Sequence, residues 1–79
     1  MHVKRPSISD SKRLRAALKQ KGIVDLHMKK LQWNISIHVN CYDLSCNISS
    51  TLIEMGYDLE SEVHNIIYVY IPKNMKVQQ

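Results

Sequence analysis

The sequence predicts a small α+β domain in which helices cover one face of a short, mostly antiparallel sheet, forming a two-layer sandwich. Apolar and polar residues alternate strictly over residues 30–39, which is the two-residue repeat of a half-buried strand. Apolar residues recur at helical spacing in residues 8–21 and 43–55, and a glycine follows each segment. The expected order is helix, strand, helix, strand, strand, in one domain of 79 residues.

The first helix is expected over residues 8–21. Ser7 and Asp10 have the spacing of a capping box, and Gly22 is placed to end the helix in the left-handed conformation. The apolar stripe of this helix is thin: Ile8, Leu14, Ala17 and Leu18. Residues 1–6 before it are expected to form a flexible basic arm.

The alternating segment 30–39 is expected to be one long strand. Its apolar face would consist of Leu31, Trp33, Ile35, Ile37 and Val39. The helices are expected to cover this face, because no other part of the chain can bury it. Residues 23–29, just before it, fit either a short strand or a connector.

The second helix is expected over residues 43–55, with Asp43 as its N-cap and Gly56 ending it. The stripe that would pack on the sheet is spaced at i, i+4, i+8 and i+11: Leu44, Ile48, Leu52 and Met55.

Two further strands complete the expected sheet. Residues 57–63 alternate weakly with acidic side chains, as an exposed edge strand does, and His64 and Asn65 would form a two-residue turn. Residues 66–71 are apolar on both faces, which is typical of a central strand, and Pro72 ends them. Residues 73–79 are expected to be a flexible tail.

A winged helix is the alternative fold. Residues 52–60 and the hairpin after them resemble the end of a recognition helix and the wing of that family, and residues 33–36 resemble the turn between its helices. Aligning that turn, however, puts Lys29 and Lys30 where the first helix needs apolar or small side chains. The resemblance covers about the last 25 residues.

Charge is distributed very unevenly. Residues 1–33 hold nine Lys and Arg against two acids, a net charge of +7, whereas residues 34–72 hold five acids and no Lys or Arg. Lys73 and Lys76 bring the chain to its net charge of +4. This asymmetry indicates a polyanionic partner for the basic half, or head-to-tail self-association.

The basic half gives the leading functional hypothesis, a non-enzymatic nucleic-acid-binding regulatory protein. Its first helix and N-terminal arm would contact the phosphates of DNA or RNA. The candidate contacts are Lys4, Arg5, Lys12, Arg13, Arg15, Lys19, Lys21, Lys29 and Lys30. The alternative is a protein-interaction module, such as a small inhibitor or antitoxin-like factor. It would bind a partner protein through an edge strand, or form a homodimer by pairing its basic and acidic halves. An acidic protein is the alternative partner for the basic helix.

Tyr68 and Tyr70 lie two residues apart and therefore on one face of the last strand. Such a pair can stack on unpaired bases, but aromatic pairs more often belong to the core or to a dimer contact.

No catalytic motif or cofactor site is predicted. His38, Cys41, Cys46 and His64 are residue types that bind zinc, but the expected second helix would begin between the two thiols. The favoured interpretation is two small, reduced, buried or half-buried cysteines. The longest apolar run has six residues, so no membrane span is expected, and the default location is the cytoplasm.

Overall fold

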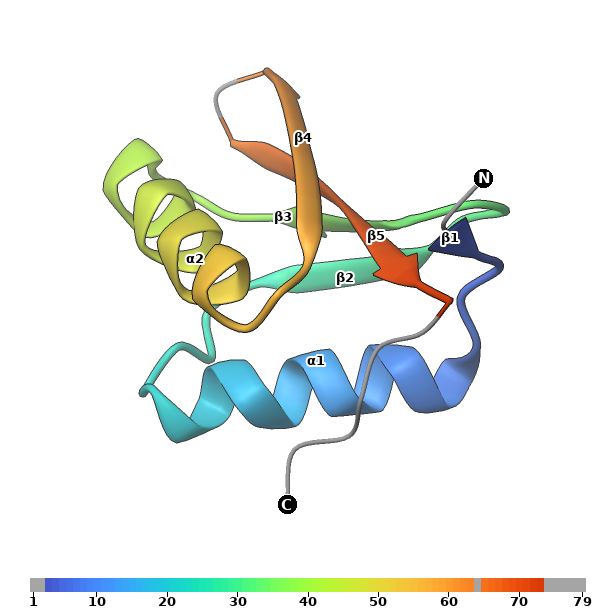
Figure 1. The fold of residues 1–79 in the computed structure, drawn as a ribbon. Coiled ribbons are helices and arrows are strands. Elements are labelled where there is room, and N and C mark those ends of the chain that lie inside the picture. The colour runs from blue at the N-terminus through green and yellow to red at the C-terminus, as the bar shows by residue number, and fades with distance from the viewer. Residues whose placement is uncertain (1–2, 64, 74–79) are drawn as a thin grey trace.

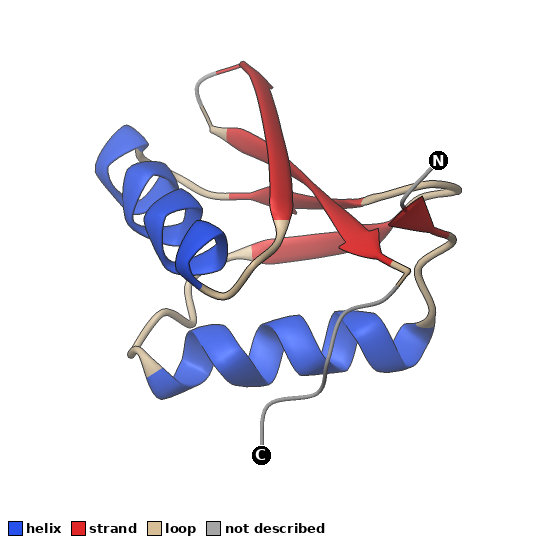
Figure 2. Cartoon of the chain, in the orientation of Figure 1, coloured by secondary structure: helices blue, strands red, loops and turns tan. Residues whose placement is uncertain are grey.

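The computed structural model describes residues 3–63 and 65–73, and in it two helices cover one face of a five-stranded antiparallel sheet (Figures 1 and 2). The elements in chain order are β1 (Val3–Lys4), α1 (Ile8–Gln20), β2 (His27–Lys30), β3 (Ile35–His38), α2 (Tyr42–Glu54), β4 (Asp58–Val63) and β5 (Ile66–Pro72). The four longer strands lie in the order β2-β3-β5-β4, and β1 pairs with the end of β5. The predicted α+β class is confirmed.

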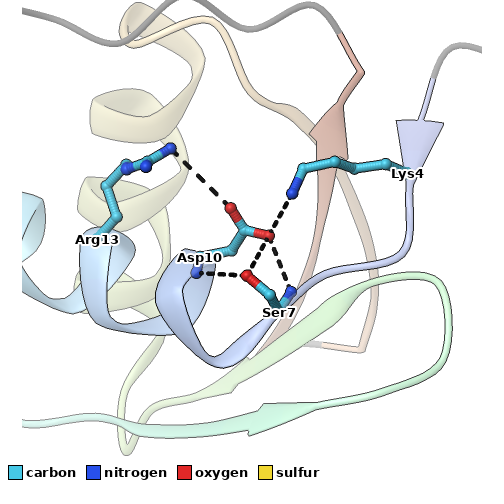
Figure 3. A network of polar contacts seen from close by, with 4 residues as sticks. All are labelled: Lys4, Ser7, Asp10 and Arg13. Carbon is cyan, nitrogen blue, oxygen red and sulfur yellow. Dashed lines mark hydrogen bonds and ion pairs between the residues drawn. The ribbon is translucent and has the colours of Figure 1, made fainter.

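α1 begins with the predicted capping box. The Asp10 backbone N–H donates to Ser7 Oγ at 3.2 Å, and the Ser7 backbone N–H donates to Asp10 Oδ2 at 2.8 Å (Figure 3). Lys4 Nζ lies 2.8 Å from the same carboxylate oxygen. Because Lys4 belongs to β1, this ion pair joins the start of the sheet to the start of α1.

Part of the expected flexible arm is therefore held in the fold. Val3 and Lys4 pair with Pro72 and Ile71 of β5, and Pro6 is buried. Residues 1–2, like residues 74–79 of the expected tail, lie outside the described part of the chain.

Both helices end in the same hydrogen-bonded turn, the Schellman motif. After α1, the Ile23 N–H donates to the Leu18 carbonyl at 3.0 Å around Gly22, whose φ is +79°. After α2, the Tyr57 N–H donates to the Leu52 carbonyl at 3.1 Å around Gly56, whose φ is +97°. Tyr57 belongs to the hydrophobic core and Ile23 packs against it, and both predicted glycine stops are confirmed.

The start of α2 differs from the prediction. Its N-cap is Cys41, which makes no side-chain capping bond, and Asp43 lies inside the first turn. The carboxylate of Asp43 is still placed favourably, since negative charge in the first turn interacts well with the helix dipole.

The predicted strand over residues 30–39 is wrong in its extent. The chain reverses at residues 31–34, where the Leu31 N–H donates to the Asn34 carbonyl at 2.8 Å, so the segment divides between β2 and β3. Trp33, expected on the buried face, is 43% exposed at this turn. The ambiguous residues 23–29 are a connector followed by the start of β2.

One hydrophobic core lies between the sheet and both helices. Its buried apolar side chains are Leu14, Leu18, Ile35, Ile37, Val39, Ile48, Leu52, Tyr57, Ile67, Val69 and Ile71. The strand members alternate in sequence, so they all point to the helical side of the sheet. Ile8, which the sequence analysis included in the α1 stripe, is 67% exposed.

The predicted pairing of the two strongest strands is confirmed, with Ile35 opposite Val69 and Ile37 opposite Ile67 in β3 and β5. The predicted edge strand is β4, whereas the turn expected at His64 lies partly outside the described residues. The winged-helix alternative is wrong, because the β2–β3 hairpin separates the two helices in sequence (Figure 1). Neither α1 nor α2 has the length and apolar character that crossing a bilayer requires.

Candidate nucleic-acid interface

Three cations form a row along α1. Lys12, Arg15 and Lys19 are exposed, and their i, i+3, i+7 spacing puts them on one flank of the helix. The inward side of the helix holds Leu14 and Leu18, which are fully buried. The capping box and the Schellman turn fix both ends of α1, so the row has a fixed position on the fold.

Arg13 lies on the opposite flank of α1. Its guanidinium is 4.0 Å from Asp10 Oδ1 (Figure 3). Its charge also acts on Tyr57, the residue just before β4. Burial raises the pKa of Tyr57, and the nearby Arg13 offsets part of that rise. Since β4 and β2 lie at opposite sides of the sheet, the row of Lys12, Arg15 and Lys19 lies on the β2 side of α1.

β2 adds two cations beside this row. α1 packs alongside β2, and Lys29 and Lys30 of β2 are exposed (Figure 1). We call the five residues Lys12, Arg15, Lys19, Lys29 and Lys30 the cationic edge. Among the side chains that the structure describes, which exclude those of residues 61–64, both ion pairs involve Asp10, so none of these carboxylates is paired with the cationic edge.

The other candidate cations are placed differently. Lys4 is bound to Asp10, and the Arg5 guanidinium lies 5.2 Å from the ring centroid of Trp33, a cation–π contact. Lys21 is exposed at the C-cap of α1. The structure therefore places five of the nine candidate residues on α1 and the neighbouring β2, with Lys29 on the sheet face away from the helices. It gives Lys4, Arg5 and Arg13 contacts of their own.

The edge of the sheet opposite β2, formed by β4, is acidic. β4 pairs only with β5 among the described strands, and its Asp58 and Glu60 are exposed. The uneven charge of the sequence thus corresponds to a cationic edge at β2 and an acidic edge at β4, on opposite sides of one sheet.

Tyr68 and Tyr70 lie on the sheet face that the helices leave uncovered. Both are half-buried, and they alternate with Ile67, Val69 and Ile71, which belong to the core. The Tyr70 hydroxyl donates to Glu60 Oε1 at 2.6 Å. A place in the core is therefore ruled out for this pair.

The cysteines are free and exposed, which corrects the expectation that they are buried or half-buried. A hydrogen bond with Cys46 raises the pKa of the exposed Tyr42 hydroxyl. In the part of the chain that the structure describes, no three His, Cys, Asp or Glu side chains gather as metal ligands; His64 lies outside that part.

The sequence did not predict one pair of neighbouring side chains, the two histidines of the β2–β3 hairpin. His27 and His38 are opposite each other in register, with ring centroids 6.2 Å apart and the rings 64° from parallel. They line a shallow cleft of about 200 Å³ together with Asp25 and Asn40. The signal that would have found them is the hairpin turn, because only its position brings residue 27 opposite residue 38.

The fold and this interface define a small α+β protein with one cationic edge, one acidic edge and an aromatic sheet face. Comparisons of the chain with models of protein families, with curated proteins and with solved structures found no match.

Proposed function

We propose that this protein binds nucleic acid, and that the cationic edge contacts the phosphates. The observation that supports the proposal is the grouping of five exposed cations on α1 and β2 with no carboxylate among the described side chains paired to them. Unpaired cations on adjacent elements can each neutralise a phosphate and release a counterion, which is the main source of sequence-independent affinity. A regulatory role would follow from such binding, because the proposed contacts are electrostatic and involve no catalytic group.

The proposal predicts a salt-dependent affinity that the α1 row controls. We expect wild-type protein to bind duplex DNA with an affinity that falls steeply between about 50 and about 200 mM salt. Replacing Arg15 and Lys19 together with alanine should lower the slope of log affinity against log salt by about 2, since each lost phosphate contact removes about 0.9. Fluorescence anisotropy with a labelled duplex measures both quantities.

A matched control separates this edge from overall charge. The double variant Arg13→Ala/Lys73→Ala also removes one arginine and one lysine, but Arg13 is on the other flank of α1 and Lys73 follows β5. Its slope should stay within about 0.5 of wild type if the footprint is the cationic edge. Equal loss in the two variants, or no wild-type binding at the lowest salt, would contradict the proposal.

A second candidate function is protein interaction through the edges of the sheet. It is favoured by the opposite charges of two strands that each pair on one side only in the described sheet: Lys29 and Lys30 on β2, and Asp58 and Glu60 on β4. Edge strands with unpaired backbone groups can add a strand from another chain, and complementary charge would select an acidic partner for β2 or a second copy of this chain.

Sedimentation against salt tests this second function. Self-association through the charged edges should be strongest at about 50 mM salt and should disappear at about 500 mM, since salt screens exposed charges. A dimer that persists at high salt would indicate an apolar contact instead, and a monomer under all conditions would exclude self-association.

A further inference from the structure

The uncovered face of the sheet has a composition of its own. Side chains alternate between the two faces along β2, β3, β4 and β5. A residue therefore lies on the uncovered face when the residues before and after it in its strand point into the core. We call this set the open face: His27, Lys29, Ser36, His38, Asp58, Glu60, Ile66, Tyr68 and Tyr70. Ile66 is the aliphatic member of this set, and Pro72 of β5, Val63 opposite Ile66 and Val3 opposite Pro72 lie on the same face by register.

One row of the open face crosses all four strands. Register places Lys29 of β2 opposite Ser36 of β3, Ser36 opposite Tyr68 of β5, and Tyr68 opposite Glu60 of β4. Ser36 is only 2% exposed although no helix lies over this face. Its small side chain is therefore covered by larger neighbours, and the half-buried Tyr68 lies opposite it in register.

The two tyrosines differ in what holds them. The Tyr70 hydroxyl is bonded to Glu60 at 2.6 Å, so that ring is directed toward the acidic edge. Tyr68 lies between Ser36 of β3 and Glu60 of β4 in register, and Ser36 is in turn opposite Lys29 of β2. His38 is two residues from Ser36 on β3 and in contact with His27, which extends the aromatic surface toward β2.

We infer that the open face binds single-stranded nucleic acid, with one base stacked on Tyr68, a neighbouring base on His38, and the backbone along β2. This inference rests on the proposed nucleic-acid binding and adds the substrate class. Aromatic rings stack on any unpaired base, and a cationic groove follows the backbone beside them, which is the pattern by which single strands are bound. A duplex keeps its bases stacked inside, so only its phosphates reach the cationic edge.

Charge and polarity favour this occupant over a second copy of the chain. Lys29 belongs both to the open face and to the cationic edge, so the two surfaces are continuous, and Asp58 and Glu60 would repel phosphates from the far side. The backbone is therefore confined to the β2–β3 half. A homodimer interface has a mostly apolar centre, whereas the row that crosses the middle of this face holds Lys29, Ser36, Tyr68 and Glu60, two of which are charged.

The test compares a labelled single strand of thymidine or uridine nucleotides with a duplex of equal length. Tyr68→Ala should weaken binding of the single strand about 10- to 100-fold, the loss expected when a stacking ring is removed, and Tyr68→Phe should restore binding to within about 2-fold of wild type. Duplex affinity should be unchanged in both variants. Tyr42→Ala is the control, since it removes the same ring from an exposed position on α2, away from the sheet face.

The outcomes distinguish failure of the inference about the open face from failure of the proposed function of the cationic edge. Unchanged single-strand binding by Tyr68→Ala, with duplex binding and its salt slope intact, overturns this inference and leaves the proposed function standing. Absence of wild-type binding to both probes overturns both. A wild-type dimer that Tyr68→Ala dissociates would show that the face binds a second copy instead. Ultraviolet cross-linking of the wild-type protein to the single strand needs no variant: the expected adduct is on the β5 peptide, and its absence there overturns the inference.

Discussion

Replacement of Leu52 by alanine is expected to lower the free energy of unfolding by about 2–5 kcal/mol, the usual cost of a cavity left by a large core side chain. Leu52 is fully buried between α2 and the sheet, and its carbonyl accepts the Tyr57 N–H of the Schellman turn. Alanine keeps the helix propensity of leucine, so the loss measures packing rather than helix formation. A domain of this size is expected to have a total stability of only about 4–12 kcal/mol. Urea denaturation followed by circular dichroism gives the difference.

The adjacent residue provides the control for this measurement. Ile53 is 61% exposed on the same helix, one position further along. Ile53→Ala should change the free energy of unfolding by less than about 0.5 kcal/mol, because an exposed side chain leaves no cavity. If the two variants lose the same stability, α2 does not pack on the sheet through Leu52.

Replacement of Asp10 by asparagine is expected to cost about 2–3 kcal/mol, because hydrogen bonds to a charged group are worth more than neutral ones and Lys4 loses its partner. Asp10 is 4% exposed and accepts bonds from Lys4 Nζ and from the Ser7 backbone and hydroxyl. Asp25→Asn removes the same charge from an exposed loop position and should change stability by less than about 0.5 kcal/mol. Urea denaturation at neutral pH compares the two variants.

The same carboxylate gives a pH dependence with a defined sign. Burial raises the pKa of Asp10, but the hydrogen bonds from Lys4 and Ser7 outweigh it, so the pKa in the folded protein lies below its ordinary value of 3.8. The stability that Asp10 contributes is therefore fully present above pH 3.8 and is lost as the pH falls through the lowered pKa. The stability difference between wild type and Asp10→Asn should shrink over that acidic range. A difference that is constant with pH would mean that the ionised carboxylate has no part in it.

The helices could be predicted from the sequence because their ends carry specific chemistry. Ser7 and Asp10 satisfy the free N–H groups at the start of α1, and Gly22 and Gly56 supply the positive φ that both Schellman turns require. The start of α2 has no such signal, since Cys41 makes no side-chain capping bond. The prediction of Asp43 as the cap depends only on the preference of its residue type for that position.

The β2–β3 hairpin could not be predicted for the opposite reason. Its turn contains neither glycine nor proline, and no non-glycine residue in the described chain has a positive φ. The apolar alternation continues through Leu31 and Trp33. The pattern therefore predicts one continuous strand where the structure has β2, a turn and β3. A reversal that uses ordinary backbone conformations leaves no mark on composition, and only pairing with the rest of the sheet reveals it.

The candidate interface was predictable in part. The row of Lys12, Arg15 and Lys19 follows from helical spacing alone, and the structure places it on one flank of α1. The contacts of Lys4 with Asp10 and of Arg5 with Trp33 join residues from different elements, so spacing contains no information about them. The open face also depends on the hairpin, because the turn decides which side chains of β2 share a face with Tyr68.

β5 is the common neighbour of β1, β3 and β4, and it is the last of the described strands. During synthesis the earlier elements emerge first, but the strand that joins them is missing until residues 66–72 have been added. The pairing of Val3 with Pro72 then closes a loop of almost the whole described chain, and such distant contacts make folding slow. The nascent chain therefore has a period in which its β2–β3 hairpin and both apolar helix stripes are exposed, when a chaperone has most to bind and aggregation is the main competitor of folding.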